Sequence, residues 1–117
     1  GKPQFYQSPD QVTYSLAEIE APTGNAESSL KMVCEMTVTA MKMKLKGSKT
    51  NIKYGPESKN CMFRVQGKAL IVGMVNAAGK RVHLLTVVVP GSAHKEEHKD
   101  SIEAFFKSYR LVPAANP

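Results

Sequence analysis

Residues 68–89 read KALIVGMVNAAGKRVHLLTVVV, and this stretch decides the fold. Two apolar runs, 68–76 and 81–89, are separated by residues 77–80. Short apolar runs rich in β-branched residues are typical of strands, and Gly79 tolerates the positive φ that a tight turn requires. The stretch therefore predicts an antiparallel β-hairpin.

Shorter segments on either side predict further strands of the same sheet. Residues 12–20 are rich in β-forming residues, and residues 50–54 and 61–65 flank a turn that contains Gly55 and Pro56. Together with the hairpin they predict the α+β class, with an antiparallel sheet of about four to six strands.

A helix is predicted over residues 29–46, a run without Gly or Pro. One stripe at helical spacing contains Leu30, Val33, Cys34, Thr37, Met41 and Leu45. A second stripe beside it contains Met32, Met36, Ala40 and Met43. Ser28 or Ser29 is the expected N-cap and Gly47 the expected stop. Residues 41–46 also alternate as a strand would, so a strand remains the alternative there.

A second helix is predicted over residues 94–108. Its apolar stripe recurs at helical spacing and consists of Ile102, Phe105, Phe106 and Tyr109. We expect this stripe to lie on the sheet and residues 110–112 to add a short edge strand. The expected organisation is an extended or loose segment over 1–11, one α+β domain over 12–112 and a tail over 113–117.

Length and charge restrict the class of protein. The chain has 117 residues and a net charge of +6, from 16 Lys and Arg against 10 Asp and Glu, so we expect anions to be attracted. The apolar run 84–89 stops at Pro90, far short of the roughly 20 residues of a membrane helix. We therefore expect a soluble domain without a transmembrane segment.

The compartment depends on what precedes the chain and on its two cysteines. The sequence begins at Gly1 without Met, which suggests that it was trimmed. If a signal or anchor segment was removed, we expect the protein to be exported or periplasmic, and otherwise cytoplasmic. Cys34 and Cys61 are interpreted as buried free thiols, with a disulfide as the alternative in an exported protein.

The closing segment carries a resemblance. Residues 102–111 read IEAFFKSYRL and follow a strand that ends in Val-Val-Val-Pro at 87–90. This pattern resembles small uncharacterised bacterial domains, and the order of elements over about 13–112 resembles the PsbP-type fold, in which helices sandwich an antiparallel sheet. The resemblance implies that fold and a non-enzymatic, often exported accessory class. Its motifs are packing residues, so it transfers no functional residue.

Three histidines and one cysteine are candidates for chemistry. His94, Glu97 and His98 match the H-x-x-E-H zinc pattern, but a metalloprotease also needs a third ligand and a cleft. We interpret this stretch as a solvated helix face. The third hypothesis is a metal-binding or hydrolytic protein that uses His94, Glu97 and His98, with His94 and His98 as the metal ligands. His83 is interpreted as a structural residue of its strand, and Cys34 as a packing residue rather than a nucleophile.

Lysines and methionines are the candidates for binding. Every charged residue between Glu35 and Glu57 is a lysine, namely Lys42, Lys44, Lys46, Lys49 and Lys53. These could bind phosphates, nucleic acid or an anionic surface, although a solvated face explains them too. A ligand or partner groove between helix and sheet could be lined by Met32, Met36, Met41 and Met43, although core filling is the favoured role.

No catalytic set or cofactor motif stands out from the sequence, so we predict no cofactor. The predicted function is a non-enzymatic binding or accessory domain that recognises a protein or a small ligand. The alternative is an anion, nucleic-acid or anionic-surface binder that uses the lysines.

Overall fold

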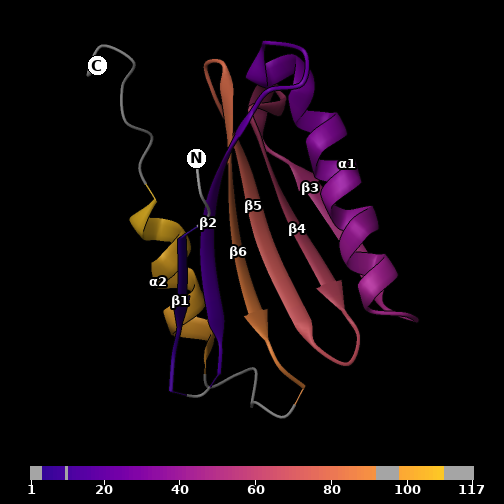
Figure 1. The fold of residues 1–117 in the computed structure, drawn as a ribbon, viewed down its shortest axis with the longest axis vertical. Helices are drawn as coiled ribbons and strands as arrows, with labels where there is room; N and C mark the ends of the chain where they lie inside the picture. The colour runs from indigo at the N-terminus through magenta and orange to yellow at the C-terminus, as the bar shows by residue number, and fades with distance from the viewer. Residues whose placement is uncertain (1–3, 10, 92–97, 110–117) are drawn as a thin grey trace.

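The computed structural model describes residues 4–9, 11–91 and 98–109. Its strands form one antiparallel six-stranded sheet in the order β1-β2-β6-β5-β4-β3, as Figure 1 shows. In chain order the elements are β1 Gln4–Gln7, β2 Thr13–Glu20, α1 Ala26–Lys44, β3 Lys49–Tyr54, a 3₁₀ turn Pro56–Ser58, β4 Asn60–Gln66, β5 Leu70–Ala78, β6 Arg81–Val89 and α2 Lys99–Ser108. The α+β prediction is confirmed.

The predicted hairpin lies at the centre of the sheet. β5 and β6 pair in antiparallel register from Leu70 opposite Val89 onward, and Gly79 has a φ of +70° in the turn. Gly73 lies within β5, and an ideal Cβ built on it would lie 2.0 Å from the ring of Phe63 on β4. Because Gly73 has no side chain, the ring of Phe63 can pack directly against the backbone of β5.

The larger core lies between the sheet and α1. Alternate residues of a strand point to opposite faces, and α1 packs chiefly against the residues of β4 and β5 on one face. The buried members of this core are Ala21, Ala26, Leu30, Val33, Cys34, Val38, Cys61, Phe63, Val65, Ile71, Val75 and Val82. The first predicted helical stripe thus faces the sheet.

A smaller core lies on the opposite face, beneath α2. Its buried members are Val12, Leu70, Val87, Val89 and Ile102, and partly buried Tyr14, Val72, Phe105 and Phe106 pack against them. In Figure 1, α2 lies on the side of β1 and β2, away from β3 and β4. The two helices therefore cover opposite faces of the sheet and different halves of it.

Helix α1 settles the alternative over residues 41–46. The helix runs to Lys44 and Leu45 is its C-cap, so residues 41–44 are helical and the strand interpretation is wrong. Its N-cap is Asn25, whose Oδ1 accepts the backbone N–H of Ser28 at 3.1 Å. The expected caps Ser28 and Ser29 instead lie within the first turn.

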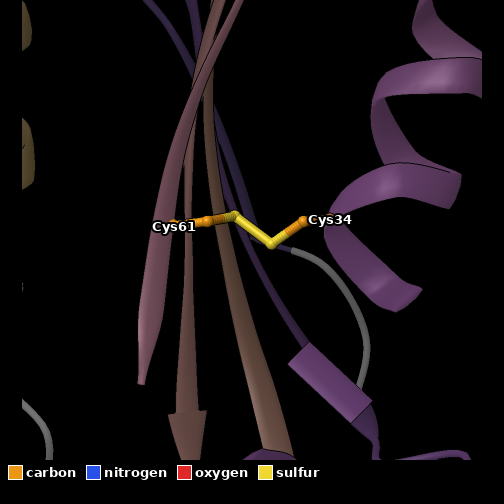
Figure 2. The surroundings of a disulfide bond; sticks show 2 residues. All are labelled: Cys34 and Cys61. Atoms are coloured by element: carbon orange, nitrogen blue, oxygen red, sulfur yellow. A yellow bond between two sulfur atoms is a disulfide. The ribbon is translucent and has the colours of Figure 1, made fainter. Parts of the chain in front are cut away.

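Cys34 and Cys61 form a disulfide, so the favoured prediction of free thiols is wrong. Both residues are fully buried, as expected, and the bond joins α1 to β4 (Figure 2). Cys34 lies on the sheet-facing stripe of the helix and Cys61 on the helix-facing side of its strand. The pairing follows from this packing, which a separation of 27 residues does not reveal.

The ends of the chain were predicted in part. The described part of the second helix is Lys99–Ser108, and Ile102 is its buried residue. Residues 94–97 and the edge strand expected at 110–112 lie outside the described residues. At the other end, Gln4–Gln7 of the segment expected to be extended or loose form β1 and pair with β2.

Candidate binding surfaces

Three cations gather on the part of the sheet that faces away from α1. Ile52 of β3 packs into the core beneath α1, so the alternation of a strand points Lys49 and Lys53 to the opposite face. Arg64 of β4 lies opposite Asn51, between the positions of the two lysines along the strand. All three cations are exposed. We refer to Lys49, Lys53 and Arg64 as the cationic patch.

No carboxylate within the neighbouring strands offsets this charge. β3, β4 and β5 contain neither Asp nor Glu. Among the neutral neighbours, Met62 lies opposite Lys53 and is 41% exposed. Glu57, in the turn before β4, pairs with Lys59 at 3.0 Å. The patch is therefore an exposed surface of one sign of charge, which attracts anions.

The other predicted lysines lie elsewhere. Lys42 and Lys44 are in the last turn of α1, and Lys46 lies in the loop that leads to β3. All three are exposed. Because α1 covers the face opposite the cationic patch, the five lysines do not form one stripe. Arg64 was not predicted from the sequence, and it belongs to the patch because β4 pairs with β3.

The four methionines of the predicted groove are split between two environments. Met41 packs against the core beneath α1. Met32, Met36 and Met43 are 38%, 63% and 73% exposed. Their spacing of four and seven residues places them on one outer face of the helix. They fill no core, and they do not face the sheet where the groove was expected.

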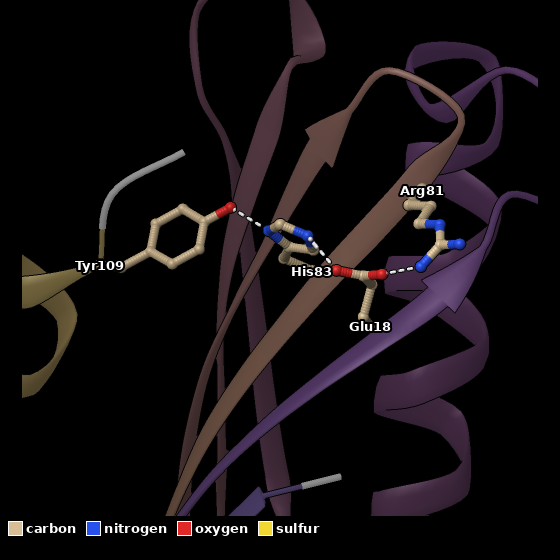
Figure 3. A network of polar contacts seen from close by, with 4 residues as sticks. All are labelled: Glu18, Arg81, His83 and Tyr109. Carbon is tan, nitrogen blue, oxygen red and sulfur yellow. Dashed lines mark hydrogen bonds and ion pairs between the residues drawn. The ribbon is translucent and has the colours of Figure 1, made fainter. Parts of the chain in front are cut away.

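A polar network ties the end of α2 to the sheet (Figure 3). The Nε2 atom of His83 on β6 lies 3.1 Å from Oε2 of Glu18 on β2, and its Nδ1 lies 2.6 Å from the hydroxyl of Tyr109. Arg81 donates to the other carboxylate oxygen of Glu18. Both ring nitrogens of His83 thus contact protein groups, as expected for a structural histidine.

The network shifts the titration of two of its members. The hydrogen bond from Arg81 lowers the pKa of Glu18 below its ordinary 4.5, and the contact with His83 acts in the same direction. Burial raises the pKa of Tyr109 above 10.0, and the nearby Glu18 carboxylate adds to this shift. Glu18 and Arg81 could not be identified from the sequence, because their contacts depend on the pairing of β2 with β6.

Two residues of the zinc motif, His94 and Glu97, lie outside the described residues. His98 is buried, with 7% of its surface exposed, so the expectation of a solvated face is wrong for this residue. Among the residues that the structure describes, no three His, Cys, Asp or Glu side chains are grouped as a metal site requires. Within the same residues, no helix combines the length and apolar character of a membrane span.

Comparisons with known proteins show the fold alone. No family model matches the chain, and no curated protein does. A crystal structure of PA94 from Pseudomonas aeruginosa, described as a protein of unknown function with a suggested role as a regulator, is similar at a TM-score of 0.70. The match covers 97% of this chain and 85% of PA94 at 13% sequence identity. The chain and PA94 thus share a fold, an antiparallel sheet with helices.

Proposed function

We propose that the protein is a non-enzymatic binding module whose cationic patch holds an acidic segment of a partner protein. The observation that supports this is the gathering of exposed Lys49, Lys53 and Arg64 on strands that contain no acidic residue. Such a surface raises the rate of encounter with anionic partners and disfavours cationic ones.

Two of the candidate catalytic side chains, Cys34 and His83, are engaged in structural contacts. Cys34 is bonded to Cys61, so it offers no thiolate for attack. His83 contacts Glu18 and Tyr109 through its two ring nitrogens. These contacts support binding rather than catalysis as the role of the domain.

An acidic polypeptide suits the patch better than a nucleic acid does. Proteins that bind single strands combine cations with aromatic side chains on which the bases stack. The aromatic residues of β3 and β4, Tyr54 and Phe63, lie on the alternate positions that face α1, and β5 has none. The patch therefore offers charge without a stacking surface.

An exported accessory role is part of the proposal. Disulfides form and persist in oxidising compartments, and the buried Cys34–Cys61 bond supports such a location. The PsbP-type resemblance of the sequence points to the same class of exported, non-catalytic domains. PA94, the protein of similar fold, carries a suggested role as a regulator.

The test compares two triple charge reversals of equal net charge. Fluorescence anisotropy would measure binding of a labelled polyglutamate peptide to the wild type, to a patch variant (Lys49→Glu, Lys53→Glu, Arg64→Glu) and to a control variant on α1 (Lys31→Glu, Lys42→Glu, Lys44→Glu). We expect the patch variant to lose affinity for the peptide by about tenfold or more, because it loses direct charge contacts with the peptide as well as long-range attraction. The control variant loses only the long-range attraction, so its affinity should fall much less.

Two results would contradict the proposal. One is an equal loss in both variants, which would show that only net charge matters. The other is tighter binding of labelled oligothymidylate, or of vesicles that contain phosphatidylserine, with the same dependence on the patch. Either ligand would then replace the acidic polypeptide as the partner class.

A further inference from the structure

We propose that the acidic segment binds as an added antiparallel strand along the free edge of β3, with acidic side chains opposite Lys49 and Lys53. This inference rests on the proposed function of the cationic patch. It adds the conformation of the partner, the spacing of its acidic residues and the backbone contacts that hold it.

No strand of the described residues pairs with the outer edge of β3. Among the described residues β3 is the last strand of the sheet and pairs only with β4, as Figure 1 shows. A strand at the edge of a sheet presents a row of unpaired N–H and C=O groups to a further chain. Strand addition uses these groups for affinity and the side chains for specificity.

The register shows which peptide groups point outward. Just beyond the end of β3, the Gly55 N–H donates to the carbonyl of Asn60 at 2.9 Å, so these two opposite residues form a hydrogen-bonded pair that continues the β3–β4 ladder. Such pairs alternate with pairs that exchange none. The peptide groups of Lys53 and Lys49 therefore point toward β4. Those at the intervening positions, Thr50, Ile52 and Tyr54, point to the free edge.

The two lysines then occupy the positions that favour charge pairing. An added strand would exchange its hydrogen bonds with Thr50, Ile52 and Tyr54. Lys49 and Lys53 would lie in the pairs without hydrogen bonds, where opposite Cα atoms are only about 4.5 Å apart. Opposite charges in such pairs stabilise a sheet. The partner therefore needs acidic residues four positions apart, on the face where Arg64 of the neighbouring strand adds a third cation.

The same lysines disfavour a second copy of this chain as the occupant. In an antiparallel pairing of two β3 strands centred on Asn51, Lys49 of each copy would lie opposite Lys53 of the other. Like charges directly opposite destabilise strand pairing, and edge lysines protect natural sheets from joining in this way. The opposite edge, β1, reads Gln-Phe-Tyr-Gln and offers no charge for selection.

The experiment separates strand addition from simple attraction by modifying the peptide backbone. The probe is a fluorescein-labelled peptide in which Glu alternates with Thr and Val, so that the Glu side chains can face Lys49 and Lys53. In one form the Thr and Val nitrogens, which would donate to β3, are methylated. In the matched control the Glu nitrogens, which would point away from β3, are methylated. All forms carry the same charge.

We expect methylation of the Thr and Val nitrogens to weaken binding by about tenfold or more, and methylation of the Glu nitrogens to have a much smaller effect. Amide hydrogen exchange should slow at Thr50, Ile52 and Tyr54 when the unmodified peptide binds. Thr50→Pro should also weaken binding, because it blocks the free edge without removing a bond to β4. Circular dichroism would check that this variant folds.

The outcomes distinguish the two proposals. If both methylated peptides bind as tightly as the unmodified one, while the charge reversal of the cationic patch still weakens binding, strand addition is wrong and the proposed function stands. If the unmodified peptide binds the patch variant as well as the wild type, the proposed function fails and strand addition fails with it.

Discussion

Gly73 shows how one missing side chain shapes the centre of the sheet. The ring of Phe63 occupies the space above it, and a Cβ at this position would lie 2.0 Å from that ring. We expect Gly73→Ala to lower the free energy of unfolding by about 1–3 kcal/mol, as overpacking of a core does. Urea denaturation measures the loss.

The control for this prediction is a double variant. Phe63→Leu removes the ring, so adding Gly73→Ala to it should cost much less than Gly73→Ala costs in the wild type. Equal costs in the two backgrounds would show that the ring is not the source of the destabilisation.

Glu18 contributes to the dependence of stability on pH in the acidic range. Its pKa is lowered in the folded state by the hydrogen bond from Arg81. Stability from this carboxylate is therefore present above the ordinary pKa of 4.5 and is lost as the pH falls through the lower folded value. We expect Glu18→Gln to reduce the midpoint of urea denaturation at neutral pH. The difference from the wild type should shrink as the solution is acidified below pH 4.5.

Arg81→Gln is the companion variant for Glu18. It removes the first cause of the lowered pKa, so it should reduce the dependence of stability on pH over the same acidic range. A gap between Glu18→Gln and the wild type that stays constant down to the lowest pH would contradict the assignment.

At the scale of elements, helix α1 has two apolar faces with different roles. Met41 packs against the core, whereas Met36 is 63% exposed on the outer face. We expect Met41→Ala to lower the free energy of unfolding by about 1–2 kcal/mol, because the residue is only partly buried. Met36→Ala should change it by less than about 0.5 kcal/mol. Thermal or urea unfolding of both variants measures the contrast, and equal losses would show that the outer face is also packed.

The elements that were predicted correctly are those with local patterns. The hairpin has apolar runs and Gly79 in its turn, and α1 has a sheet-facing stripe from Leu30 to Leu45. The start of α1 was missed because several residues there can cap, and Asn25 provides the bond to Ser28. A linear pattern offers no way to choose among them.

The candidate sites form through contacts between residues that lie far apart in the sequence, so only some of their residues could be predicted. Lys49 and Lys53 were identified, but Arg64 joins them only through the pairing of β3 with β4. Met32, Met36 and Met43 were placed on the correct helix, but a wide apolar arc does not show which side meets the sheet. The partner of Cys34 likewise depends on packing.

For the whole molecule, the disulfide is the main covalent constraint on stability. It closes a loop with a sequence separation of 27 between Cys34 and Cys61. In the chain-entropy model a loop of this size contributes about 3–4 kcal/mol. We expect the double variant Cys34→Ala, Cys61→Ala to lose about that much, as measured by denaturation in urea.

Reduction of the wild type provides the control. Dithiothreitol should lower the denaturation midpoint of the wild type and leave that of the double alanine variant unchanged. A wild type that keeps its midpoint after the thiols have been shown to be free would contradict the loop-closure account.

The disulfide also determines how the molecule would respond to force. Tension applied at the two ends of the chain passes from Cys34 to Cys61 through the sulfur atoms, so the residues between them carry none. Because β3 lies in this stretch, the strand proposed to receive the partner would not be stretched. The disulfide prevents the loop between the two cysteines, about 90 Å of contour length, from extending under force. A pulled molecule would gain this length only after the disulfide is reduced.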